Sequence, residues 1–126
     1  MTTAVSIQNV TKYSQLVARV VGELRKERNF DQKKFAEALR VSPSTWSRAE
    51  NGQVGLSLDQ LAGAATVLKT TPAHILNCAD RAADQLGRKG VTVLTGKDAG
   101  TDDQRFAYLG AAALGALIAT ILARAK

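Results

Sequence analysis

Residues 32–52, QKKFAEALRVSPSTWSRAENG, decide the fold of this chain. They divide into two short segments with the apolar spacing of helices, and each segment has a helix-start signal. Asp31 precedes the first segment, while Ser42 followed by Pro43 opens the second, where a proline costs no hydrogen bond. The second segment stops at an Asn-Gly pair, which breaks helices. Because Ala36 is small, the second helix can pass closely over the first, so the stretch predicts two helices that cross at a steep angle.

The side chains of this helix pair fall into an inward set and an outward set. The inward positions that lock the pair are Phe35, Leu39, Val41, Trp46 and Ala49. The outward face of the second helix carries Ser44, Thr45, Ser47 and Arg48. All four outward side chains can form hydrogen bonds, and none is a carboxylate. This face is therefore the candidate contact surface.

Upstream of this pair, the chain changes from an uncharged start to a helical pattern. Residues 1–10 carry no charge and lack the basic start and long apolar core of a signal peptide. From Val10 onward, apolar residues recur at steps of three and four residues, which predicts a helix. Ser14 is its candidate N-cap, and the helix should fade after Arg28. We expect residues 1–13 to form an N-terminal arm.

Downstream of the pair, two further helix starts complete a small helical domain. Ser57 is followed three residues later by Gln60, which is the pattern of a capping box. A Thr-Pro pair at residues 71–72 repeats the cap-then-proline signal and predicts a short fifth helix. Five helices joined by short loops predict an all-α fold, with the domain occupying residues 14–78.

This pattern resembles the helix-turn-helix family of phage lambda repressor and Cro, also called the xenobiotic-response-element family. The resemblance extends from about residue 16 to residue 76. It rests on residues 32–52, on the upstream LRKERNFDQ that ends at Gln32, and on the downstream SLDQLAGAATVLKTTPAHIL that begins at Ser57. It implies a five-helix, lambda-repressor-like DNA-binding domain that binds double-stranded DNA.

The resemblance also implies roles for individual residues. Residues 43–50 would be the recognition helix in the major groove, with the residues at its start nearest the base edges. Gln32 would clasp a phosphate at the start of the preceding helix, and Arg48 would contact a base or a phosphate. The DNA-binding residues that the resemblance implies are Gln32, Lys33, Ser42, Ser44, Thr45, Ser47, Arg48, Asn51 and Gln53.

Two positions depart from the pattern of the family. Arg40 stands where the turn commonly has a glycine, so a left-handed backbone there would cost about 1 kcal/mol. Pro43 occupies a position that often holds a polar, base-reading side chain. Its ring can offer only an apolar contact, such as one to a thymine methyl group.

Composition narrows the remaining classes of function. The chain has 126 residues, with 17 Lys and Arg against 11 Asp and Glu. The net charge of +6 favours a polyanionic partner or an anionic membrane surface. One Cys and one His fall short of a zinc site, and no phosphate loop or nucleophile–base pairing stands out. We therefore expect no catalytic residue, no metal and no cofactor. A single thiol without a signal peptide indicates the cytoplasm, where the protein would associate with the nucleoid.

The region after Cys78 has a different character. Residues 79–104 form a predicted connecting region, in which residues 79–86 could continue a helix and residues 91–94 are β-prone. A stretch rich in Gly, Asp and Thr then leads to a hydrophobic C-terminal helix, predicted within residues 105–126. Its core, residues 106–123, contains no charged residue.

The large apolar residues of this last helix form one stripe. They are Leu114, Leu117, Ile118, Ile121 and Leu122. The stripe fits three partners. It can dimerise with its own copy, or it can anchor in the inner membrane through residues 106–123, which would span about 27 Å of a ~30 Å hydrocarbon core. It can also fold back onto its own domain.

The function predicted from these features is a sequence-specific, homodimeric transcriptional repressor of bacterial or phage origin. It would bind double-stranded DNA at a pseudo-palindromic operator, with no cofactor. The alternative is an interaction module on the same fold, either antitoxin-like or tethered to the membrane. In the antitoxin-like case, the chain from residue 79 onward would wrap a protein partner.

Overall fold

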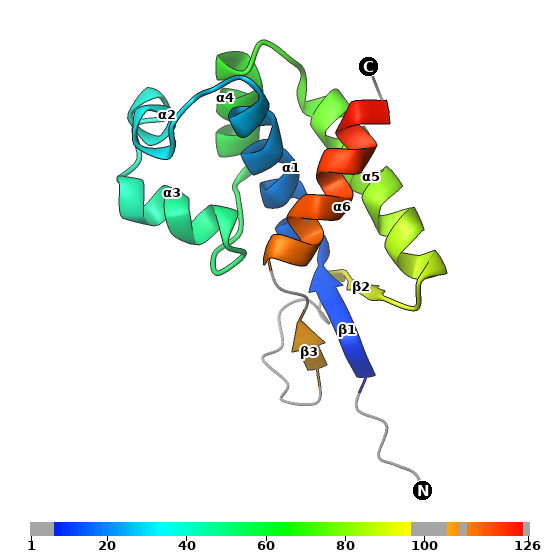
Figure 1. Ribbon diagram of the computed structural model, residues 1–126. Coiled ribbons are helices and arrows are strands. Elements are labelled where there is room, and N and C mark those ends of the chain that lie inside the picture. Colours follow the sequence, from blue (N-terminus) through cyan, green and yellow to red (C-terminus); the bar gives the residue numbers. More distant parts are fainter. Residues whose placement is uncertain (1–6, 97–105, 109–110, 125–126) are drawn as a thin grey trace, which may run out of the picture.

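A computed structural model describes residues 7–96, 106–108 and 111–124 of the chain (Figure 1). Across these residues the chain forms six helices and three short strands. In chain order they are β1 (Ile7–Lys12), α1 (Tyr13–Glu27), α2 (Gln32–Ala38), α3 (Pro43–Glu50), α4 (Leu58–Val67), α5 (Pro72–Arg88), β2 (Thr92–Leu94), β3 (Phe106–Tyr108) and α6 (Ala111–Arg124). The predominantly helical fold confirms the predicted fold class.

The starts of α2, α3, α4 and α5 confirm the caps predicted from the sequence. In each helix the capping oxygen accepts the backbone N–H three residues later, which satisfies a donor that the helix itself cannot. The caps are Asp31 at 2.7 Å, Ser42 at 3.1 Å, Ser57 at 3.0 Å and Thr71 at 3.0 Å. Gln60 completes the capping box by accepting the N–H of Ser57 at 2.9 Å. These caps fix where each helix begins.

The ends of α1 to α5 share one backbone motif. Each helix is followed by a residue with a positive φ, and the next N–H donates to the carbonyl five residues before it, so the last carbonyls are satisfied. The residues with positive φ are Asn29, Arg40, Gly52, Lys69 and Gly90. The connections are therefore short and sharply defined, which sets the crossing of α2 and α3.

Arg40 has the left-handed backbone that its place in the turn suggested, with a φ of 61°. A side chain is disfavoured in this region, so we expect Arg40→Gly to raise the free energy of unfolding by about 1 kcal/mol. Ala38→Gly is the control, because Ala38 is helical and glycine there should destabilise by a similar amount. Thermal unfolding followed by circular dichroism measures both. A lower melting temperature for Arg40→Gly would contradict the turn geometry.

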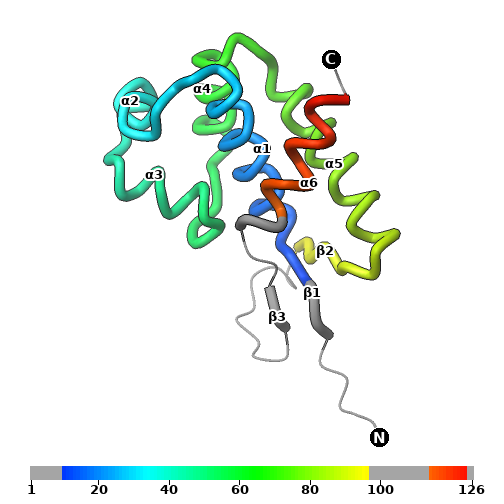
Figure 2. Tube along the Cα trace, viewed as in Figure 1, coloured from blue at the N-terminus to red at the C-terminus, as the bar shows by residue number. Residues whose placement is uncertain are grey.

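The core of the domain is organised around α1. Figure 2 shows α1 between α2 and α3 on one side and α5 and α6 on the other. Trp46 is 1% exposed and its ring lies 5.1 Å from that of Phe35, which in turn contacts the ring of Phe30. The prediction that Trp46, Phe35 and Ala36 face inward is confirmed, since all three are buried. Trp46 is therefore a core residue of the helix-turn-helix unit.

The N-terminus differs from the prediction. The chain is extended over Ile7–Lys12 as β1, and α1 begins at Tyr13, so Ser14 is not its N-cap. β1 is the central strand of a parallel sheet in the order β2-β1-β3, and Val10 is paired with Thr92. The segment is a strand because it pairs with β2 and β3, which come much later in the chain. β-branched Val10 and Thr11 are fully buried beside strands from the far end of the chain, which local spacing cannot reveal.

The predicted boundary at residue 78 falls inside a helix. α5 runs without a break from Pro72 to Arg88, so the fifth helix is much longer than expected. Its second half is held in place because Ala79, Ala82 and Leu86 are buried in the common core. The β-prone run that follows forms β2. Most of the predicted linker, residues 97–103, lies outside the described residues.

The hydrophobic C-terminal helix packs in cis. α6 begins at Ala111 rather than Phe106, because Phe106–Tyr108 is a strand. It lies against α1 and α5, and Leu114, Ile118, Ile121 and Leu122 are at most 3% exposed. Leu117 is half-buried at the same surface.

Of the three partners that the stripe fits, the structure shows the third, its own domain. Its side chains already fill the core of their own chain, where they remove apolar surface from water. Among the described helices, none is both long enough and apolar enough to cross a membrane.

Candidate nucleic-acid interface

The candidate contact surface lies at one end of the molecule. α2 and α3 project away from the sheet, with α3 at the periphery (Figure 1). The N-cap at Ser42 and the proline at the first helical position fix where α3 starts, and Asn51 ends it. The outward side chains of α3 are therefore carried on a short, well-defined helix.

Three hydroxyl groups gather at the start of α3. The hydroxyl of Ser42 donates to the Thr45 hydroxyl at 2.7 Å and accepts the Thr45 N–H at 3.1 Å. The hydroxyl of Ser44 lies 3.3 Å from that of Ser42. Ser42 and Ser44 are exposed, whereas Thr45 is half-buried. These groups can donate to or accept from base edges or phosphates placed at the positive end of the helix dipole.

The rest of the predicted contact residues flank this cluster. Arg48 is exposed and forms no ion pair with any described residue, so its guanidinium is free to meet another molecule. Ser47 is half-buried on the same helix. Asn51 and Gln53 are exposed after α3, and Lys33 is exposed at the start of α2. These residues therefore lie along α3 and at both of its ends, with the hydroxyls at its start and with Asn51, Gln53 and the start of α2 at its end.

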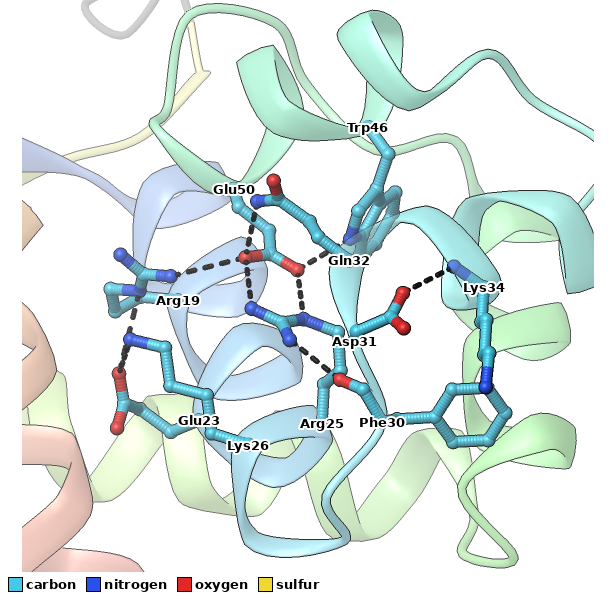
Figure 3. Close-up of polar contacts among 10 residues, drawn as sticks. All are labelled: Arg19, Glu23, Arg25, Lys26, Phe30, Asp31, Gln32, Lys34, Trp46 and Glu50. Carbon is cyan, nitrogen blue, oxygen red and sulfur yellow. Dashed lines mark hydrogen bonds and ion pairs between the residues drawn. The ribbon is translucent and has the colours of Figure 1, made fainter.

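Gln32 has a different setting from the one expected. Its side-chain amide donates to Glu50 Oε1 at 3.1 Å, and the residue is only half-exposed (Figure 3). One amide N–H is therefore already used inside the protein. A contact from Gln32 to a phosphate would have to use the other N–H of the same group.

Glu50 is the hub of a buried polar network that sequence reasoning missed. The residue is 3% exposed, and its carboxylate accepts from Arg25 Nε at 2.8 Å and from Arg25 Nη2 at 3.1 Å. It also accepts from the Trp46 indole N–H, and Arg19 Nη2 lies 3.5 Å from it. Arg25 additionally donates to the Phe30 carbonyl at 2.6 Å. Figure 3 shows how this network joins α1, α2 and α3 through one side chain.

The sequence carried one clue to this hub. Glu50 follows Trp46 by four residues, so both side chains lie on the same face of α3. A carboxylate on a core-facing position needs cationic partners, because burying an unpaired charge is very costly. Arg19 and Arg25 are each 7% exposed and supply them. Glu50 therefore ties α3 to α1 and to the first residue of α2.

The described residues offer no metal site, since no three His, Cys, Asp or Glu side chains gather there. They do include a Cys–His pair that the sequence had not suggested, with Cys78 Sγ lying 3.9 Å from His74 Nε2. Cys78 is 2% exposed, and burial raises the pKa of its thiol, so the reactive thiolate is disfavoured. The pair is therefore a packing contact on α5.

Comparison with known proteins agrees with this geometry. Residues 16–76 match a family model described as a helix-turn-helix domain. No curated protein sequence matches the chain. The crystal structure of the clp gene regulator ClgR from Corynebacterium glutamicum is similar, with a TM-score of 0.59 and 23% sequence identity. That similarity covers 61% of this chain and 82% of the ClgR chain. Residues 16–76 of this chain are therefore similar in sequence to a helix-turn-helix domain, and the similarity to ClgR shows that the two chains share a fold.

Proposed function

We propose that this protein is a transcriptional regulator that binds double-stranded DNA sequence-specifically and acts as a repressor of bacterial or phage origin. The observation that carries the proposal is the outward face of α3, where clustered hydroxyls and an unpaired Arg48 stand on a helix anchored by Glu50. A rigid helix with free hydrogen-bonding groups suits the major groove. The protein would act in the cytoplasm, without a cofactor, by occupying an operator.

The division of contacts follows from where the residues lie. Ser44, Thr45 and Ser47 would read base edges, with Ser42 at the start of the helix, and Pro43 would offer an apolar contact to a thymine methyl. Lys33, Asn51 and Gln53 would contact the phosphate backbone, together with the free amide N–H of Gln32. These backbone contacts set the register of the protein on DNA but read no sequence.

Arg48→Ala tests whether the outward face of α3 contacts DNA, because Arg48 is the cationic residue on that face. We expect it to weaken binding to a preferred duplex by about 1–3 kcal/mol, because it removes a contact to a base or a phosphate. Arg88→Ala is the matched control, since it removes the same charge from an exposed position at the end of α5. Equal losses for the two variants, measured by fluorescence anisotropy, would contradict a specific role for Arg48.

We propose that a homodimer binds the operator. A net charge of +6 gives only moderate non-specific attraction, so useful affinity depends on two domains binding together. Because the stripe of α6 is in the core, the interface must lie elsewhere. Val54 and Leu58, exposed by 41% and 82%, are the large exposed apolar residues of the described chain.

The surroundings of Leu58 suit a two-fold contact. Beside it lies a hollow of about 170 Å³ with mainly apolar walls, formed by Tyr13, Val17, Leu56, Leu61 and Leu76 among others. In a symmetric dimer, Leu58 of each copy can enter the hollow of the other, because the same patch carries both the projecting and the receiving part.

Leu58→Ser should therefore shift the protein from dimer to monomer at a given concentration. The substitution removes the projecting apolar group without disturbing the core, as Leu58 is exposed. Ala62→Ser, at an exposed position of the same helix, should leave the dimer unchanged. Sedimentation equilibrium measures both. A variant Leu58→Ser that associates as tightly as the wild type would rule out this interface.

The experiment that tests the function is selection of bound duplexes from a random DNA pool, using the full chain at moderate salt. We expect enrichment of an inverted repeat whose half-sites are centred about one helical turn apart. Weak, salt-sensitive binding with no enriched sequence would contradict the proposal.

A further inference from the structure

The C-terminal helix α6 lies outside the residues that match the helix-turn-helix family, yet it touches side chains that hold that unit together. A Cβ atom on Gly115 of α6 would lie 3.0 Å from Glu23 Oε2 and 3.8 Å from Arg19 Cδ. A side chain at position 115 would therefore press on the Glu23 carboxylate and lie against Arg19. α6 therefore closes directly over Arg19 and Glu23.

Arg19 extends from beneath α6 to the hub of the recognition unit. Its Nη2 atom lies 3.5 Å from Glu50 Oε1. Gly22 leaves this route open, because a Cβ there would lie 2.5 Å from Arg19 Nη2 and 3.2 Å from Glu50 Oε1. Glu50 in turn accepts hydrogen bonds from Gln32 and Trp46. A continuous series of contacts thus joins α6 to both helices of the DNA-binding unit.

Arg19 is the most weakly held member of this series. Its Nε atom is buried and has no hydrogen-bond partner within the described residues, and it stands 3.9 Å from Glu23 Oε2. Lys26 competes for that same oxygen at 3.3 Å. A buried donor without a partner carries a desolvation cost, so its contacts hold Arg19 only weakly. The backbone of α6 at Gly115 covers the Arg19 side chain, whose far end reaches Glu50.

The carboxylate of Glu50 responds to where Arg19 lies. Its Oε1 atom faces donors from Arg19, Arg25 and Gln32. An oxygen with two lone pairs cannot accept all three well, so the position of one donor affects how the others are held. Moving Arg19 would alter how Glu50 holds the first residue of α2 and, through its own helix, the orientation of α3.

We infer that α6 is a positioning element of the DNA-binding domain, whose packing on α1 at Gly115 keeps Arg19 at Glu50 and thereby positions Gln32 and α3. When a side chain at position 115 displaces Arg19, Glu50 keeps Arg25 as its guanidinium partner. The two DNA-contacting helices then lose part of their common anchor, and affinity for DNA falls. This inference rests on the proposed function for its effect on DNA, but the coupling from α6 to the hub can be measured without DNA.

The test compares two full-length variants of α6. Gly115→Leu places a side chain against Glu23, whereas Ala119→Leu adds one at an exposed position of the same helix. Trp46 is the single tryptophan of the chain and donates to Glu50, so its fluorescence emission reports on the hub. We expect Gly115→Leu to shift this emission and to weaken binding to the selected duplex roughly 3- to 30-fold. Ala119→Leu should match the wild type in both measurements.

Each other result has a definite meaning. Unchanged Trp46 emission in a Gly115→Leu variant that keeps its helical circular dichroism overturns the inference, and so does shifted emission with unchanged affinity. If Gly115→Leu fails to fold, Gly115→Ala adds only the Cβ atom and is judged by the same two measurements. If the wild type binds no duplex selectively, the proposed function fails, while Trp46 emission still decides whether α6 controls the hub.

Discussion

Replacing Glu50 with alanine is expected to lower the free energy of unfolding by about 3–5 kcal/mol, the range seen when one partner of a buried ion pair is removed. The carboxylate is 3% exposed and is the acceptor for Arg25, Gln32 and Trp46. Without it, two guanidinium groups remain buried with too little negative charge, and two further donors lose their acceptor. Because small domains are stable by only about 5–15 kcal/mol, this loss would leave the protein marginally folded.

Urea unfolding followed by circular dichroism measures this effect. Glu37→Ala is the matched control, because Glu37 is an exposed glutamate on α2, and it should change stability by less than about 0.5 kcal/mol. Equal stabilities for Glu50→Ala and Glu37→Ala would show that the hub does not hold the three helices together.

The second large effect concerns the C-terminal helix. Ile118 is fully buried where α6 packs on α1 and α5, so Ile118→Ala should cost about 2–5 kcal/mol through lost burial and the cavity left behind. Thr120→Ala, which truncates an exposed side chain on the opposite side of the same helix, should cost far less. Thermal unfolding compares the two. Similar melting temperatures would contradict the packing of α6 in cis.

The helix-turn-helix unit could be predicted because its determinants are local. Asp31, Ser42 and Ser57 each cap a helix that starts at the next residue, and Arg40 takes the left-handed backbone that its turn demands. Such signals act over a few residues, so the sequence itself displays them. The exposed positions of the recognition helix follow from the same spacing.

How the additions to this unit pair and pack could not be predicted, because their partners are distant in the sequence. Val10 has its strand partner at Thr92, and its spacing also fits the helix that follows. The apolar stripe of α6 is equally suited to a copy of itself, to lipid or to its own core, and only the fold selects among these partners. Ile118 lies in that core because α1 and α5 leave apolar surface for α6 to cover.

In the candidate site, too, the locally determined positions could be predicted and the contacts between distant residues could not. Ser44 and Arg48 could be placed on the contact surface from their positions in the recognition helix, and the structure exposes both. The hub at Glu50 brings together Arg19 and Arg25 from a helix more than twenty residues earlier in the chain, so no local pattern displays it. The hydrogen bond from the Gln32 amide to Glu50 also depends on the fold. The sequence therefore predicts only the contact of Gln32 with a phosphate.

The measurement that tests the central claim most directly is the affinity of the full chain for two duplexes at the same moderate salt. One carries the sequence enriched by selection, and the other has the same length and composition in scrambled order. If α3 reads the major groove, the enriched duplex should bind about 10³-fold more tightly or better, as specific binders do. Equal affinities that fall together as salt is added would show attraction to phosphate alone and would contradict sequence-specific recognition.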